Sequence, residues 1–153
     1  MATDRASFVT GNDPKLREVG LALLRIILGV VFFAHGYLKF FKMGMAGVVG
    51  FFTSLGIPAP TIAAWGVTML EMVGGLALIL GILTPVIAAL FAIEMAGVIF
   101  FAKRGQGFFA PKGYELELTL LVASLALARR AGSTLGRPRM ATGRNRFERS
   151  GAA

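Results

Sequence analysis

Long apolar runs constrain this chain more than any other feature. They extend from about Val19 to Phe41, from Thr61 to Leu83, from Pro85 to Ala102 and from Tyr114 to Ala128. A helix of roughly 20 apolar residues crosses the hydrocarbon core of a bilayer. The fourth run is short, so we expect its first turn to lie at the membrane interface. The runs predict an all-α, polytopic membrane protein with a four-helix transmembrane bundle.

Composition agrees with a membrane class. Charged residues make up only 16% of the chain and apolar residues 56%, whereas an average soluble domain has roughly 25% charged residues. The net charge of +8 therefore has to lie outside the hydrocarbon. This pattern disfavours a nucleic-acid-binding domain, in which basic residues form a face on a water-soluble fold.

The segment between the first two runs is rich in glycine and proline. Residues 42–60 read KMGMAGVVGFFTSLGIPAP. The modest apolar stretch Gly47–Leu55 predicts a short interfacial or re-entrant helix, which the Gly56-Ile57-Pro58 sequence ends.

The two ends of the chain are polar. Residues 1–18 are mixed in charge and predict a cytosolic tail, residues 19–128 form the expected membrane domain, and residues 129–153 form a basic tail with seven arginines. We expect the basic tail to be disordered and to set topology or to contact anionic lipid headgroups. With four spans, the two tails lie on one side of the membrane and together contain ten Lys and Arg residues, whereas the connecting segments on the opposite side contain four. The positive-inside rule therefore predicts that both termini are cytoplasmic.

Several routes to redox or metal chemistry are closed to this chain. It has no cysteine and a single histidine, which excludes disulfides, thiolate metal sites and a Cys-x-x-Cys redox relay. No Gly-rich nucleotide fingerprint is present. We therefore expect no metal site and no cofactor bound by a recognisable motif.

Ionisable residues inside the apolar runs are the strongest functional signal. Each costs at least about 2.5–3.5 kcal/mol near the bilayer centre, so these residues should face inward and be paired or hydrated. At about 100° per residue, the three in the first run share an arc of roughly 80°. The predicted buried polar network contains Arg25, His35, Lys39, Glu71, Glu94, Glu115 and Glu117.

The charges of this network do not balance, because four glutamates accompany two fixed cations. We expect at least one glutamate to be neutral, or His35 to be charged. Two interpretations remain open. The network could only fix helix register, or it could line a polar cavity for a small molecule, a quinone headgroup or protons.

Glycines and phenylalanines in the runs suggest packing roles. Gly36, Gly74 and Gly75 are expected to let helix backbones approach closely. The Phe-Phe pairs, such as Phe32-Phe33 and Phe51-Phe52, are expected to face lipid or the interface.

These residues stand in segments that resemble the DoxX family of small bacterial membrane proteins. The segments are LLRIILGVVFFAHGYLKFF, GFFTSLGIPAP, EMVGGLALILGILTPVIA and GFFAPKGYELELTLLVASLALA, in order within about residues 19–130. The family's Arg and His-Gly-x-x-Lys pattern matches Arg25, His35, Gly36 and Lys39. Its Glu-x-x-Gly-Gly matches Glu71, Gly74 and Gly75, and further matches are Glu94 and Glu115.

The resemblance implies a four-helix membrane bundle in the bacterial cytoplasmic membrane. It also implies a redox-associated component, linked to quinones or to stress responses, with a soluble redox enzyme or a membrane protein as partner and a homo-oligomer as a further option. This chain has Lys103 where many members have a histidine, which puts haem or metal ligation at that position in doubt. The alternative is a non-catalytic protein: a small-molecule or proton-coupled transporter, or a scaffold or assembly factor.

Overall fold

The computed structural model describes residues 14–109 and 113–135 of the 153-residue chain. Within these residues every regular element is helical and none is a strand. The predictions of a cytosolic tail and of a disordered basic tail fall, for residues 1–13 and 136–153, outside the described part of the chain. The helices, in order, are α2 (Pro14–Tyr37), the π-helix η1 (Leu38–Met43), α3 (Gly44–Ser54), α4 (Pro60–Met69), the π-helix η2 (Leu70–Gly74), α5 (Gly75–Leu80), α6 (Thr84–Ala102) and α7 (Glu115–Leu135).

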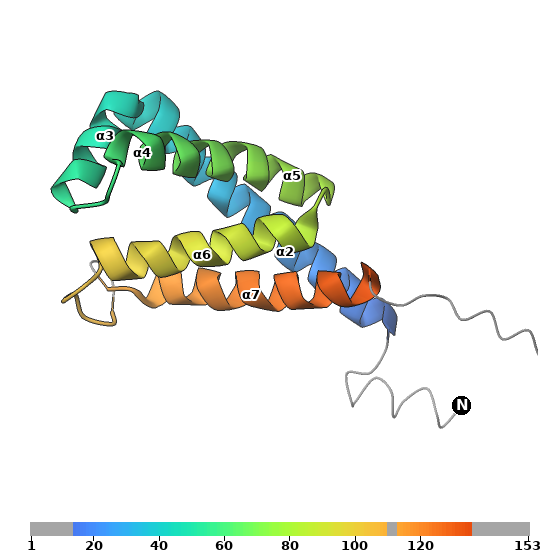
Figure 1. Cartoon of the computed structure of the whole chain (residues 1–153). Helices are drawn as coiled ribbons and strands as arrows, with labels where there is room; N and C mark the ends of the chain where they lie inside the picture. The colour runs from blue at the N-terminus through green and yellow to red at the C-terminus, as the bar shows by residue number, and fades with distance from the viewer. Residues whose placement is uncertain (1–13, 110–112, 136–153) are drawn as a thin grey trace, which may run out of the picture.

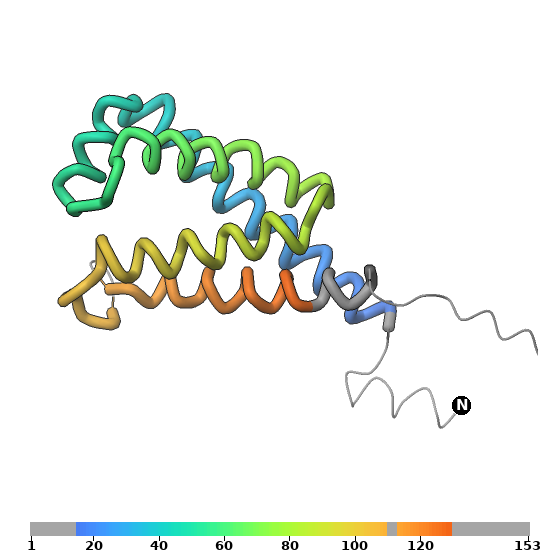
Figure 2. Tube along the Cα trace, viewed as in Figure 1, coloured from blue at the N-terminus to red at the C-terminus, as the bar shows by residue number. Residues whose placement is uncertain are grey.

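The helices form two layers that a long helix joins (Figure 1). The helix pair α6 and α7 forms the first layer, and α3 together with the continuous α4–η2–α5 helix forms the second layer. Helix α2 runs obliquely across both, as the tube in Figure 2 also shows. The start of α2 and the end of α7 lie at the same end of the molecule (Figure 1). At the opposite end the two layers diverge.

Three helical segments of the described chain are long and apolar enough to cross a membrane. They are Lys15–Ser54, Pro60–Leu80 and Thr84–Ala102. The second and third agree closely with the predicted runs. Helix α7 has 21 residues but carries two glutamates in its first turn, so its composition is less apolar. It continues to Leu135, beyond the end that the sequence predicted at residue 128.

The first of these segments contains a change of direction. Helices α2 and η1 together have 30 residues, which corresponds to about 45 Å at about 1.5 Å per residue. Gly44 then has a φ of 70° and a ψ of 152°, a conformation that glycine adopts without steric cost. The chain folds back there into α3, which packs on α4 through Val48, Phe52 and Ala64. A helix thus exists where the sequence predicted a short one at Gly47–Leu55.

A tight turn at 81–83 joins α5 to α6. Gly81 has a φ of 81° and Leu83 a φ of 47°, so both residues adopt the left-handed backbone conformation. Pro85 lies in the first turn of α6, where its missing N–H costs nothing. The Arg25 guanidinium lies against Gly81, with its Cζ 2.9 Å from where a Cβ of residue 81 would be. A cation at the carboxyl end of α5 is stabilised by the helix dipole.

The apolar core connects both layers with α2. Its buried members include Leu28 on α2, Leu78 on α5 and Leu127 on α7. Phe32 and Phe91 stack face to face, with ring centroids 3.7 Å apart and planes within 3°. The expectation that the Phe-Phe pairs face lipid or the interface is therefore wrong for Phe32 and for Phe52, which are buried. Adjacent helical residues point about 100° apart, so one member of a pair can face inward.

Glycines allow α2 to lie close to the backbones of η2 and α5. A Cβ on Gly75 would lie 2.7 Å from the Phe33 backbone nitrogen and 2.8 Å from the Gly29 carbonyl oxygen. A Cβ on Gly36 would lie 2.8 Å from the Met72 backbone nitrogen. Neighbouring backbone cannot move aside as a flexible side chain can. The small residues thus permit a backbone-to-backbone contact of the kind that is common between membrane helices.

We expect Gly75→Ala to destabilise the fold by about 1–3 kcal/mol, because the new methyl group overpacks a backbone contact. Thermal unfolding of the purified protein in detergent measures the effect. Gly66→Ala is the matched control, since a Cβ at Gly66 meets nothing within 4 Å. Equal melting temperatures for the two variants would contradict the packing role.

Candidate functional site

A partly buried ion pair joins η1, which continues α2, to η2. The Lys39 Nζ lies 2.6 Å from the Glu71 Oε1 and donates a hydrogen bond to it. Glu71 is only 2% exposed. Both partners lie in π-helices, Lys39 in η1 and Glu71 in η2. Single π-helical turns within α-helices occur frequently at functional sites, and here two of them carry the two halves of one ion pair.

Glu94 on α6 lies in the same region without a donor of its own. It is 9% exposed, and neither of its carboxylate oxygens receives a hydrogen bond from a described residue. It interacts electrostatically with Glu71 and with Lys39, and it lies close enough to Glu71 for the two carboxyl groups to share a hydrogen bond when one of them is protonated. A buried carboxylate normally has hydrogen-bond partners, so an unpartnered one needs an explanation.

A second ion pair lies between the end of α6 and the start of α7. The Lys103 Nζ is 3.2 Å from the Glu117 Oε1 and also donates a hydrogen bond to the Gly113 carbonyl oxygen at 3.1 Å. Lys103 thereby connects both ends of the α6–α7 loop. The other carboxylate oxygen of Glu117 is buried and receives no hydrogen bond from a described residue.

These polar groups line one cavity of about 410 Å³. Its walls are mainly apolar and come from both layers and from α2. They include the aromatic residues Phe32, Phe51, Phe52 and Phe101. A cavity of this size with mainly apolar walls and a few convergent polar groups is typical of a small-molecule site.

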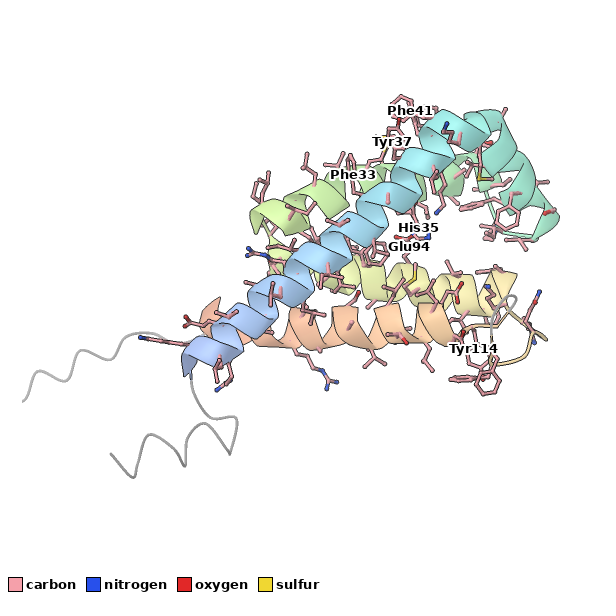
Figure 3. The ribbon with its side chains drawn as sticks, turned by 180° about the vertical axis from the view of Figure 1, so that it is seen from behind. Phe33, His35, Tyr37, Phe41, Glu94 and Tyr114 are labelled. Atoms are coloured by element: carbon pink, nitrogen blue, oxygen red, sulfur yellow. The ribbon has the colours of Figure 1, made fainter. Side chains whose placement is uncertain are left out.

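The single histidine also faces this cavity. His35 lines it from α2, and its Nδ1 lies 2.8 Å from the Val31 carbonyl oxygen. If Nδ1 carries the proton and donates to that carbonyl, Nε2 of the neutral ring remains an acceptor. Figure 3 shows His35 and Glu94 in the space between α2 and α6, whereas Tyr37 and Phe41 lie on the other side of α2.

The structure brings together five of the seven residues that the sequence grouped. Two others lie elsewhere. Arg25, which precedes His35 by ten residues in α2, lies beside Gly81. Neither Arg25 nor Glu115 lines the cavity. The five residues that line it are His35, Lys39, Glu71, Glu94 and Glu117.

Sequence reasoning missed Lys103 as a member of the site. It counted this lysine as a loop charge that sets topology and as the replacement for a histidine that many family members have. The available signal was its position, because Lys103 directly follows α6 and Glu117 lies in the first turn of the next helix. The loop between two antiparallel helices brings such residues together. In the described part of the chain, no group of three or more His, Asp or Glu residues could hold a metal ion.

The fold and the cavity define a class: a helical membrane protein with partly buried ion pairs around a mainly apolar cavity. The DoxX family model matches residues 20–104, more than half of the chain. This protein belongs to the DoxX family, as its sequence motifs predicted.

Relatives of known name are bacterial proteins. A Bacillus subtilis (strain 168) protein named "Putative oxidoreductase CatD" is 36% identical over 111 residues, 72% of this chain and 78% of that protein. The "Uncharacterized membrane protein Rv3486" of Mycobacterium tuberculosis is 35% identical over 60% of this chain and 58% of its own length. The "Inner membrane protein YphA" of Escherichia coli is 33% identical over 53% of this chain and 56% of its own length. No solved structure matches this chain significantly.

Proposed function

We propose that this DoxX-family protein is a redox-associated membrane component that binds a small amphiphilic molecule in the cavity described above. The cavity is the observation that carries the proposal, because it combines apolar walls with a partly buried ion pair and a buried carboxylate that receives no hydrogen bond from a described residue. The redox association draws support from the name of the Bacillus subtilis relative.

A quinone-type ring is the first candidate for this molecule. Lys39 can donate a hydrogen bond to a ring carbonyl, and Glu94 can accept one from a hydroxyl of the reduced ring. The apolar walls suit the hydrocarbon body, so the residues present fit such a group. A quinone would supply two-electron redox chemistry when bound. The residues of this chain would bind and orient it and exclude water from the polar end.

Mass spectrometry of lipophilic molecules that co-purify with the protein tests this proposal. We expect a bound quinone or a similar amphiphile with the natural sequence and its loss in Glu71→Gln, because the amide cannot form the ion pair with Lys39. Glu18→Gln is the control, since this exposed residue near the start of α2 does not line the cavity. A preparation that carries no lipophile in either protein would contradict the proposal.

The alternatives give different outcomes. Proton-dependent flux of a small molecule through protein-containing liposomes would indicate a transporter. A cellular phenotype that survives both Glu71→Gln and His35→Ala would leave a scaffold or assembly role. A homo-oligomer and a soluble redox enzyme at the cytoplasmic face are further expectations that cross-linking in membranes tests.

We also propose a four-span arrangement in the cytoplasmic membrane, with α7 as the fourth span, α3 at the interface and both termini in the cytoplasm. The shared location of the start of α2 and the end of α7 supports it (Figure 1), because an even number of spans returns the chain to the same side. The asymmetry of Lys and Arg residues between the two sides supports the orientation.

The absence of cysteine from the chain makes this topology directly measurable. In cells with an intact cytoplasmic membrane, we expect a membrane-impermeant thiol reagent to label Gln106→Cys in the α6–α7 loop and not Glu18→Cys. Permeabilised cells provide the control, since both variants should then react. The opposite labelling pattern would reverse the orientation, and labelling of both in intact cells would contradict the topology.

A further inference from the structure

Four buried carboxylate oxygens around the cavity lack a hydrogen-bond donor among the described residues. They are the Oε2 atoms of Glu71 and Glu117 and both oxygens of Glu94. All three side chains line the same cavity. A buried acceptor that is left without a hydrogen bond costs free energy. The cavity therefore offers several acceptors to any molecule that brings hydrogen-bond donors.

The formal charge of the cavity is negative, which favours the same kind of ligand as the surplus of acceptors does. Lys39 and Lys103 contribute two positive charges, and the three glutamates contribute three negative ones. With all three carboxyls ionised and His35 neutral, the lining carries −1. Each lysine already pairs with one glutamate, which leaves Glu94 as the carboxylate without an ion pair. A proton or a bound cation would neutralise it.

The cavity walls restrict which cations fit. They are mainly apolar, with the rings of Phe51, Phe52 and Phe101 among them. Among the described residues, no three His, Asp or Glu side chains are grouped so that they could hold a metal ion, whereas an organic cation gains from burying its apolar body. Aromatic ring faces also attract ammonium groups.

From these observations we propose that the cavity binds a lipophilic ammonium ion, in which a protonated amine donates hydrogen bonds to Glu94 and an apolar body lies against the aromatic wall. This inference uses the cavity of the proposed function but does not require a redox role. An ammonium group supplies N–H donors for carboxylate oxygens that lack them, and its positive charge balances the formal charge of −1. A quinone carbonyl, which only accepts hydrogen bonds, supplies neither at Glu94, and a hydroxyl of the reduced ring supplies a donor but no positive charge.

Calorimetric titration of the purified full-length protein in detergent tests the inference. The probes are a naphthyl-alkyl primary amine and the alcohol of the same length. We expect the amine to bind at least about ten-fold more tightly, since charge-assisted hydrogen bonds are the stronger ones. Glu94→Gln should lose most of this preference, Glu94→Asp should keep part of it, and Glu18→Gln should keep all of it. Melting temperatures of the variants verify that each is folded.

Equal affinity for the amine and the alcohol would overturn the inference, as would an unchanged preference in folded Glu94→Gln. A short-chain quinone and its reduced form, titrated into the same preparations, separate this inference from the proposed function. Binding of the quinone without the amine would refute only the ammonium site. Binding of the amine without any quinone would leave the ammonium site standing and remove the support for a quinone-linked role.

Discussion

Lys39→Met is expected to lower the free energy of unfolding by about 3–5 kcal/mol, because it leaves the Glu71 carboxylate buried without its cation. Glu71 is 2% exposed, and the Lys39 ammonium 2.6 Å away is its only ion-pair partner in the described residues. Thermal unfolding in detergent measures the effect. For a chain of this length the loss corresponds to about 6–20 °C, since one kcal/mol shifts the melting temperature by about 2–4 °C.

The double variant Lys39→Met/Glu71→Met is the control for this prediction. An apolar pair of similar volume in place of a buried ion pair is often neutral or stabilising, so the double variant should melt above Lys39→Met. If the double variant were as unstable as the sum of the two single variants, the ion pair would contribute no coupling energy. The loss in Lys39→Met would then come from packing of the lysine stem.

Glu94→Met is expected to act in the opposite direction and to raise the free energy of unfolding by about 1–3 kcal/mol. The substitution removes a buried group whose oxygens receive no hydrogen bond from a described residue, and leaving such a group unsatisfied costs about this much. The thioether chain fits the apolar surroundings, to which Met95 and Val98 already contribute. Binding of the naphthyl-alkyl amine should be lost in the same variant.

Glu18→Met provides the control for Glu94→Met, because a substitution on an exposed face normally changes stability by no more than about 0.5 kcal/mol. A lower melting temperature for Glu94→Met would show that the carboxyl group stabilises the fold, for instance through a proton that it shares with Glu71. The opposite signs expected for Lys39→Met and Glu94→Met distinguish a structural ion pair from a residue retained for binding at a cost in stability.

Much of the helical architecture could be predicted because it depends on local properties. The length of each apolar run approximates the length of a helix, and glycine and proline mark where helices stop. Thus Gly81 and Pro85 flank a turn that the sequence placed correctly within a few residues. The assignment of α7 as a span is harder, because Glu115 and Glu117 in its first turn reduce its apolar length. Composition alone does not decide how deeply such a helix sits.

The site could be predicted only in part, since side-chain direction depends on neighbours that sequence periodicity does not contain. Helical periodicity placed Arg25 on the same stripe as His35 and Lys39. The Arg25 side chain instead lies against Gly81 at the carboxyl end of α5, where the absence of a side chain on the glycine leaves room for the guanidinium. Lys103 was missed because a loop, and not a helix face, brings it to Glu117.

The two π-helices at Lys39 and Glu71 have a consequence for comparing relatives of this protein. A π-helical turn contains one residue more than the α-helical turn it replaces. Removing one residue from Leu38–Met43 or from Leu70–Gly74 would restore an ordinary helix and rotate everything beyond it by about 100°. An alignment gap of one residue in either segment should therefore mark relatives that have lost the ion pair, even where a lysine and a glutamate are still present nearby.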